Sequence, residues 1–252
     1  MKTNTALRRM RQGLPAIGAG ATLGSPFAAE LLTLAGFDYV MVDVQHGNWD
    51  DEAILLAFQL INLGSATPMI RVPQNDFYAI GRALDRGALG IVVPMVNSVA
   101  EAEAVARACR YPPRGGRSFG PFATSLYGSD YATSVDGELF VAVQIESKEA
   151  AEQAEAILSV DGIDGCWVGP EDLARSLGAD VSTPAGLAAR ERAIAGVLHA
   201  CRNTGKIPGI ACGLDARDRI AQGFLYIRAG ADQSFINASA AETLKLNRSV
   251  SS

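Results

Sequence analysis

Eight short apolar segments recur along the chain, and each is followed by a stretch of helical character or helix length. They are rich in small and β-branched residues and bounded by turn formers, which is typical of strands buried on both faces of a parallel sheet. The expected strands are 16–22, the run from Tyr39 to Asp43, 68–72, 90–95, 139–146, 165–169, 207–212 and 224–229. Eight such units, spaced by roughly 20 to 50 residues, meet the requirement of a (β/α)8 barrel, although a doubly wound open sheet could use the same pieces.

The positions of the polar residues favour the barrel. Asp43, His46, Arg71, Glu146 and Asp172 all lie at or just beyond the carboxyl ends of expected strands. A barrel brings those ends together at one mouth, whereas an open sheet spreads them along an edge. The sequence therefore predicts an α/β protein, a (β/α)8 TIM barrel that forms a single domain over residues 1–252, with one site at its mouth.

Composition excludes several classes of partner. The 252 residues, 48% of them hydrophobic, can bury a large core. A net charge of −5, with only a short basic cluster at 8–11, argues against nucleic acid, and we expect a surface helix there. No apolar run approaches the membrane-spanning length of about 18 residues. The four cysteines lack a disulfide or zinc-ribbon spacing, which indicates reduced core thiols in a cytoplasmic protein. They are Cys109, Cys166, Cys201 and Cys212.

Two segments lie outside the strand–helix alternation. Residues 111–138 begin with many turn formers and are expected to stay irregular, and a loop this long in a compact domain is usually functional. Residues 230–246 form an expected C-terminal helix, and the segment from Ala229 to Leu246 has few charges. That helix is suited to packing against a neighbouring subunit.

Asp43 ends an expected buried strand, so its carboxylate needs a partner. His46 follows three residues later, where the chain turns at Gly47, and is near enough to be that partner. The alternative is that Asp43 caps a loop and His46 is incidental. Only one other histidine exists, His199, and it lies in a helical run, so His46 is the candidate for proton transfer near neutral pH.

Each remaining mouth residue also has a structural alternative. Arg71 could be an ion-pair partner for any nearby acid. Glu146 could cap the helix that starts at Ser147, and Asp172 could be an ordinary acid at a helix N-terminus. As a pair, however, the two carboxylates offer oxygen ligands without histidine or cysteine, which suits Mg²⁺ or Mn²⁺. The glycines of 18–24 resemble a dinucleotide loop only superficially, because their spacing is one residue too long and no phosphate-binding lysine accompanies them.

Several motifs together resemble the HpcH/HpaI aldolases, which are metal-dependent class II pyruvate aldolases. The similarity runs in register over about residues 15 to 240. The segments that carry it are 42–46, 70–72, the run from Gly90 to Val96 continuing to Arg110–Pro113 and Arg117, 144–146, 160–165 and 169–173. The resemblance implies a carbon–carbon lyase that makes or cleaves 4-hydroxy-2-oxo acids through the enolate of pyruvate or hydroxypyruvate and an aldehyde.

The same resemblance implies roles for individual residues. Glu146 and Asp172 match the metal ligands, Arg71 matches the residue that holds the oxo acid, and His46 with Asp43 matches a catalytic dyad. Gln144 matches a position beside a water molecule on the metal. The carboxylate of the substrate would lie in a backbone cradle formed by Gly169, Pro170, Glu171 and Asp172. A homohexamer is implied as well. The loop segments 117–121 and 127–131 look closer to relatives that accept hydroxypyruvate or varied aldehydes.

Three alternatives to this function stay open. A Schiff-base aldolase needs a lysine at the mouth, and only Lys148 is placed for it. A CoA-ester lyase of the malyl or citryl type shares the barrel and the acid pair, although no basic cleft for a CoA tail is evident. A non-catalytic barrel that binds oxo acids is the third.

Overall fold

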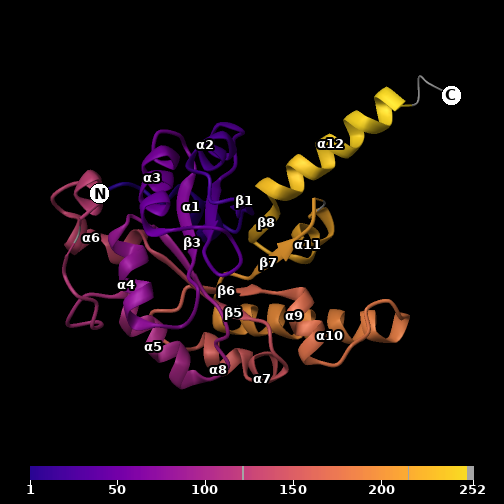
Figure 1. Ribbon diagram of the computed structural model, residues 1–252. Helices are drawn as coiled ribbons and strands as arrows, with labels where there is room; N and C mark the ends of the chain where they lie inside the picture. The colour runs from indigo at the N-terminus through magenta and orange to yellow at the C-terminus, as the bar shows by residue number, and fades with distance from the viewer. Residues whose placement is uncertain (121, 215, 249–252) are drawn as a thin grey trace.

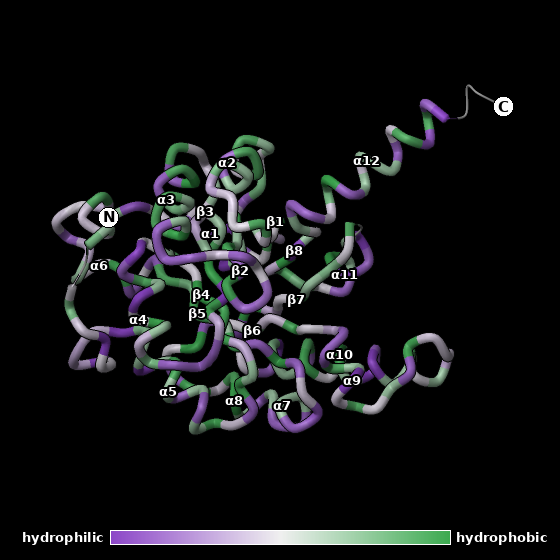
Figure 2. The backbone as a smooth tube through the Cα atoms, in the orientation of Figure 1, coloured by the Kyte–Doolittle hydropathy of each residue, from purple (hydrophilic) through white to green (hydrophobic). Residues whose placement is uncertain are grey.

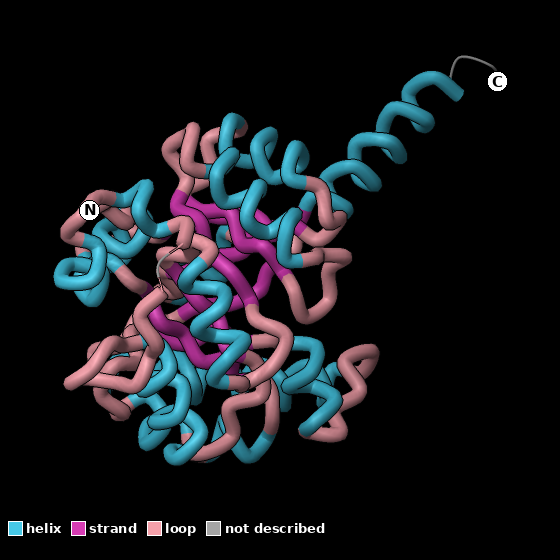
Figure 3. The backbone as a smooth tube through the Cα atoms, turned by 60° about the vertical axis from the view of Figure 1, so that its left-hand side comes forward, coloured by secondary structure: helices cyan, strands magenta, loops and turns pink. Residues whose placement is uncertain are grey.

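The computed structural model describes residues 1–120, 122–214 and 216–248, so Pro121 of the expected loop lies outside it. Eight parallel strands close into a barrel in chain order, and β8 pairs with β1. The strands are β1 Ala16–Ala21, β2 Tyr39–Asp43, β3 Thr67–Arg71, β4 Gly90–Val93, β5 Phe140–Ile145, β6 Gly165–Val168, β7 Gly209–Cys212 and β8 Tyr226–Ala231. The barrel expected from the sequence is confirmed, and Figure 3 shows its strands enclosed by helices.

Helices follow the strands around the barrel (Figure 1). They are α1 Thr5–Arg11, α2 Pro26–Leu34, α3 Asp51–Ile61, α4 Phe77–Asp85, α5 Val99–Cys109, α6 Tyr131–Glu138, α7 Lys148–Glu152, α8 Ala154–Leu158, α9 Pro170–Ser176, α10 Pro184–Thr204, α11 Arg217–Gln222 and α12 Asp232–Arg248. Several begin at a side-chain cap. Ser98 accepts the Glu101 N–H at 3.3 Å, and the Glu101 carboxylate reaches back to the Asn97 N–H at 2.6 Å. This is a capping box in which the returning carboxylate accepts the N–H of Asn97, the residue before the N-cap, instead of that of Ser98 itself.

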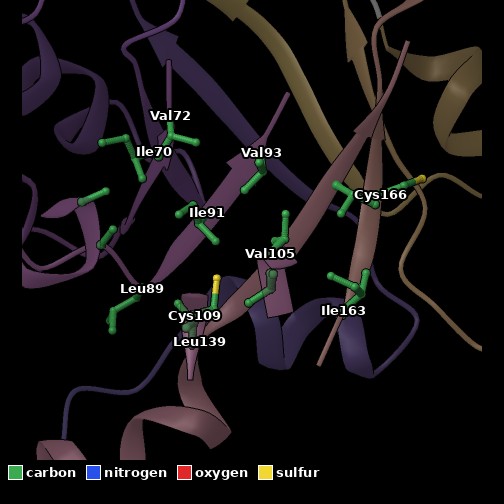
Figure 4. Close-up of a cluster of buried hydrophobic side chains, with 14 of the residues drawn as sticks. Ile70, Val72, Leu89, Ile91, Val93, Val105, Cys109, Leu139, Ile163 and Cys166 are labelled. Atoms are coloured by element: carbon green, nitrogen blue, oxygen red, sulfur yellow. The ribbon is translucent and has the colours of Figure 1, made fainter. Parts of the chain in front are cut away.

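Apolar side chains form two layers. The outer layer lies between strands and helices, where Ile91 and Val93 of β4 pack near Val105 and Cys109 of α5 (Figure 4). The inner layer fills the barrel, with Tyr226 in ring contact with Tyr39 and Phe140 at centroid distances of 4.6 and 5.0 Å. Both layers exclude water, and Figure 2 shows the hydrophobic character of the strands.

Helix α1 closes the amino-terminal end of the barrel. Ala6, Leu7 and Met10 are buried against the inner layer, whereas Arg8 and Arg11 are exposed. The expected surface helix is thus amphipathic, and its apolar face completes the core.

Inward-facing residues become polar toward the carboxyl ends of the strands. Because side chains alternate along a strand, the inward positions are two residues apart. They read Tyr39, Met41, Asp43 on β2; Met69, Arg71 on β3; Phe140, Ala142, Gln144 on β5; and Tyr226, Arg228 on β8. The barrel therefore has an apolar interior and a polar mouth at one end.

The segment 111–138 is more ordered than the sequence predicted. It contains a 3₁₀ turn, η1 Thr124–Tyr127, and the helix α6. Arg117 is buried within it, donates to Asp85 at 2.7 Å and to the Tyr131 hydroxyl at 3.1 Å, and lies 4.6 Å from the centroid of the Tyr111 ring. The expectation of irregular structure was wrong for α6 because a tertiary cluster, which local composition does not reveal, holds that weakly helical sequence in place.

The C-terminal helix α12 extends beyond the expected 230–246 and projects away from the barrel (Figure 1). Its first residue, Asp232, is buried and accepts hydrogen bonds from the Thr22 amide and hydroxyl at 2.9 and 2.6 Å. This contact fixes the base of α12 to the end of β1. None of the helices within the described ranges is long and apolar enough to cross a membrane.

Candidate active site

Glu146 lies just past β5, at the centre of the polar mouth. Its Oε1 accepts the Met95 N–H at 2.9 Å, and its Oε2 accepts a hydrogen bond from the Gln144 amide. Burial raises the pKa of Glu146, and the neighbouring negative charge of Asp172 raises it further. Ser147, whose hydroxyl accepts the Ala150 N–H at 3.0 Å, caps α7, so the alternative role of Glu146 as that cap does not hold.

Asp172 approaches the same region from the first turn of α9. Its side chain is 54% exposed and lies 3.9 Å from Arg175, so it does occupy the helix N-terminal position considered from the sequence. Among the residues that the structure describes, no group of three or more His, Cys, Asp or Glu side chains gathers as a metal site. A cation held by these two carboxylates would therefore need further oxygen ligands from solvent or substrate.

The surroundings of Glu146 fit a hard divalent cation. Gln144 Oε1 is buried without a hydrogen-bond partner, which leaves a further oxygen donor beside the carboxylate. A Cβ atom at Gly169 would lie 3.2 Å from Gln144 Nε2 and from Glu146 Oε2, so glycine keeps this corner open. Carboxylate and amide oxygens are the ligands that Mg²⁺ and Mn²⁺ prefer.

Met95, directly after Pro94, has a strained backbone. Its φ is 54°, in the left-handed region that residues other than glycine rarely adopt. This conformation accompanies the hydrogen bond from its N–H to Glu146. The strain is therefore located at the contact that orients the carboxylate.

Asp43 and Arg71 form a buried ion pair. Register places them opposite each other on β2 and β3, and Arg71 Nε donates to Asp43 Oδ1 at 2.9 Å while Nη2 donates to Oδ2. Their side chains are 1% and 6% exposed. Arg71 is therefore an ion-pair partner of an acid, as the structural alternative stated. The pair also holds the Arg71 guanidinium in place at the mouth.

The partner of Asp43 differs from the sequence expectation. The imidazole of His46 is exposed. Among the described residues, it makes no hydrogen bond to Asp43. Instead, the His46 backbone N–H donates to Asp43 Oδ1 at 3.2 Å, so Asp43 also caps the turn. The reason is register, because the adjacent strand presents a guanidinium directly to the carboxylate.

Sequence reasoning missed Arg228 and Trp167. The guanidinium carbons of Arg71 and Arg228 lie 5.0 and 5.3 Å from the Trp167 ring centroid, and Arg228 Nη1 lies 3.9 Å from Asp43 Oδ2. Arg228 was counted as part of an apolar strand. The sequence did contain a signal for it, because Arg228, like Arg71, is the only charged residue in an expected apolar strand.

The glycines of the apparent dinucleotide loop have another explanation. A Cβ at Gly18 would lie 2.4 Å from the Tyr39 ring, and one at Gly20 would lie 3.0 Å from Arg228 Nη1. Both are strand residues of β1 that make room inside the barrel. Lys148, the Schiff-base candidate, is 55% exposed and lies 3.8 Å from Glu152, a surface pair on α7.

A (β/α)8 barrel with acids, a fixed arginine and an imidazole at its carboxyl-terminal mouth defines a barrel enzyme. The family model described as HpcH/HpaI aldolase/citrate lyase matches residues 21–238, and the chain belongs to this family. The carbon–carbon lyase class expected from the sequence is confirmed.

Named relatives are similar over nearly the whole chain. A hydroxypyruvate/pyruvate aldolase of Rhizorhabdus wittichii is 39% identical, covering 92% of this chain and 94% of the relative. A 4-hydroxy-2-oxovalerate aldolase of Rhodococcus jostii is 36% identical, covering 91% and 90%. A crystal structure of a family protein from Burkholderia cenocepacia matches with a TM-score of 0.89 and 30% identity, covering 98% of this chain and all of that one.

Proposed function

We propose that this protein is a divalent-metal-dependent aldolase that makes or cleaves 4-hydroxy-2-oxo acids, using the enolate of pyruvate or hydroxypyruvate and an aldehyde acceptor. The names of the relatives support this substrate class. The observation that carries the proposal is the buried Glu146, whose pKa is raised, beside Asp172 and across the mouth from a fixed arginine. Burial makes the ionised form of this carboxylate unfavourable, and a bound cation would stabilise that form.

Glu146 and Asp172 would hold the ion, Mg²⁺ or Mn²⁺, with Gln144 beside it. When bound, such an ion supplies positive charge that stabilises the enolate of the oxo acid. Neither residue donates nitrogen or sulfur, so zinc is disfavoured.

Arg71 is proposed to bind the oxo acid. Asp43 and the Trp167 ring hold its guanidinium in place, so little reorganisation accompanies binding. The first-turn amides of α9 have no partner within the helix, and those of Glu171 and Asp172, which follow Gly169 and Pro170, are suited to the substrate carboxylate. Asp43 is then a positioning residue.

His46 is proposed to move the proton of the aldol hydroxyl. Its imidazole is exposed at the mouth, and its backbone is fixed to Asp43. In cleavage it would accept that proton as the carbon–carbon bond breaks, and in synthesis it would return it. An imidazole can both accept and return a proton near neutral pH, as the two directions of the reaction require.

Small-molecule 2-oxo acids and aldehydes are the proposed partners, together with further copies of the chain in a homohexamer. The exposed side chains of Ile236, Leu244 and Leu246 on α12 support an assembly through this helix. The four free cysteines are consistent with a proposed cytoplasmic location.

The test follows pyruvate C3 proton exchange with solvent and cleavage of a 4-hydroxy-2-oxo acid in the same preparation. Chelation should abolish both, and Mg²⁺ or Mn²⁺ should restore them. His46→Ala should lower cleavage by a factor on the order of 10² while exchange falls much less. Full activity in excess chelator would contradict the proposal. Activity on acyl-CoA thioesters alone would favour the CoA-ester lyase, and binding of oxo acids without exchange would favour a non-catalytic barrel.

A further inference from the structure

Arg228 is an enclosed cation whose hydrogen-bonding capacity is largely unused. Its side chain is 20% exposed, Nε is buried without a partner, and its one ion pair within the described residues is the 3.9 Å contact to Asp43. Asp43 already accepts two hydrogen bonds from Arg71. Among the described residues, two arginines therefore share this one carboxylate, and Arg228 has no ion-pair partner of its own.

Arg228 also borders a cavity of about 400 Å³ next to the mouth. The cavity lies between the start of α9 and the ends of β7 and β8, and Pro170, Glu171, Cys212 and Arg228 contribute to its wall. Its other arginines are neutralised, since Arg219 donates to both carboxylate oxygens of Glu191 at 2.6 and 2.8 Å and Arg190 pairs with Glu171 and Glu191 at 3.2 Å each. Of the described residues that line the cavity, Arg228 is therefore the cation that remains for a ligand.

The barrel makes room for this side chain at Gly20. A Cβ there would lie 3.0 Å from Arg228 Nη1 and 3.3 Å from the Ala231 Cβ. The close neighbour is the end of a flexible side chain, so alanine at position 20 would displace the guanidinium while the strand remains intact. Glycine at this position thus permits the observed place of Arg228.

We propose that Arg228 is a specificity-determining residue that binds an anionic group, carboxylate or phosphate, on the aldehyde acceptor. This rests on the proposed aldolase function, in which Arg71 and the α9 amides take the oxo acid. The acceptor must lie beside the enolate, and the adjacent cavity with its uncompensated cation then receives the acceptor's far end. A guanidinium matches both carboxylate and phosphate oxygens.

The experiment measures kcat/KM for matched acceptor pairs, with pyruvate as the donor. The pairs are succinic semialdehyde against butanal, and glyceraldehyde 3-phosphate against glyceraldehyde. Wild-type enzyme should prefer the anionic member of at least one pair, and the pair identifies the anion as carboxylate or phosphate. Arg228→Gln should lower that preference by about 10- to 100-fold, the range expected for a charged hydrogen bond.

Two further variants separate this effect from general damage. Gly20→Ala should reduce the same preference to a smaller degree, because it displaces Arg228 without removing its charge. Arg192→Gln removes an exposed arginine on α10 and should leave the preference at the wild-type value. If Arg192→Gln lowered the preference for the anionic acceptor as much as Arg228→Gln does, the effect would come from net charge and the proposal would be overturned.

The two proposals fail in distinguishable ways. Absence of both pyruvate C3 exchange and aldol activity in the metal-loaded wild type would overturn the aldolase function. An active wild type that prefers neither anionic acceptor, or an Arg228→Gln variant with unchanged preference, would overturn the role of Arg228 alone. As a readout independent of turnover, succinate should quench or enhance tryptophan fluorescence in the wild type more than in Arg228→Gln, because Arg228 lies over Trp167.

Discussion

Arg71 forms a buried ion pair with Asp43, and its proposed second role is to bind the oxo acid. Removing the arginine leaves the Asp43 carboxylate inside the barrel without hydrogen bonds from a guanidinium, and only the 3.9 Å contact to Arg228 remains as an ion pair among the described residues. We expect Arg71→Met to lower the free energy of unfolding by about 3–5 kcal/mol. The same variant should lose pyruvate C3 exchange and cleavage together, since both pass through the enolate that Arg71 is proposed to bind.

The matched control is the double variant Asp43→Asn/Arg71→Met, which removes both charges. Urea denaturation should show that it recovers much of the lost stability, while exchange remains suppressed. A single variant as stable as the wild type would show that the pair contributes nothing to the fold.

If Glu146 is a metal ligand, as proposed, metal binding should depend on pH. Burial raises its pKa, so without metal the folded protein holds this proton more tightly than the unfolded chain does. Its contribution to stability is therefore fully present below the ordinary glutamate pKa and is lost as pH rises through the raised value. Glu146→Gln should raise the Tm of the metal-free protein at neutral pH, and this gain should vanish in acid.

With added Mg²⁺ or Mn²⁺, the wild type should instead have the higher Tm of the two proteins. The metal should raise the Tm of the wild type but not that of Glu146→Gln, and its affinity for the wild type should fall as pH drops through the raised pKa. Thermal unfolding at several pH values, with and without the ion, measures both effects. Equal metal stabilisation of the two proteins would remove Glu146 from the proposed ligand set.

For single residues, the sequence predicted which side chains lie at the mouth better than it predicted which side chains they contact. Asp43, Arg71 and Glu146 were placed at the mouth because strand ends can be recognised from composition. The pairing of Asp43 with Arg71 depends on the register of β2 against β3, which a single sequence does not encode locally. Arg228 is a lone charge in an expected buried strand, so its presence could have been noticed, but its closeness to Gly20 of β1 could not be derived from local sequence.

Among the elements, the segment from Tyr111 to Glu138 depends on one buried cation. Arg117 contacts Asp85, Tyr111 and Tyr131, so its loss removes the centre of the cluster that anchors α6. We expect Arg117→Ala to cost about 2–4 kcal/mol of stability. Limited proteolysis should show faster cleavage within this segment.

Arg114→Ala provides the control. Arg114 lies in the same segment but is 57% exposed, with a 3.3 Å pair to Asp136. An exposed pair contributes little, so the change should stay within about 0.5 kcal/mol of the wild type. Similar losses in both variants would mean that the segment responds to any change of charge.

The elements themselves were largely predictable. Apolar, β-branched runs bounded by glycine or proline gave the strands to within a few residues, because both faces of each strand are buried. Helix α6 was not predictable, since its sequence, with Thr133, Ser134 and Gly137, has weak helical propensity.

For the molecule as a whole, the barrel covers only the base of α12 in the described chain, where Phe235 stacks on Phe37 at a centroid distance of 5.8 Å. Of its described residues, only Asp232 is buried, whereas Ile236 and Leu244 are 57% and 50% exposed. If this helix joins subunits, Ile236→Asp and Leu244→Asp place a charge in an apolar contact and should shift the hexamer toward smaller species.

Sedimentation velocity at micromolar concentration measures the change. Lys245→Glu alters charge at a polar position of the same helix and should leave the assembly closer to the wild type. A wild type that sediments as a monomer would exclude the proposed hexamer. The eightfold alternation predicted the barrel but gave no information on assembly, because subunit contacts leave no periodic signal in the sequence.

The inward-facing residues of the barrel separate along its axis into an apolar column and a polar rim. Tyr39, Met69, Phe140 and Tyr226 belong to the column, while Asp43, Arg71, Gln144 and Arg228 lie two or more residues further along the same four strands. Selection for a higher Tm can therefore act on the apolar column, and selection for a new acceptor can act on the polar rim of the same strands. In laboratory evolution, changes from the two sets should combine nearly additively where the changed residues share no contact, whereas changes at Trp167, which belongs to the column and lies against Arg71 and Arg228, should not.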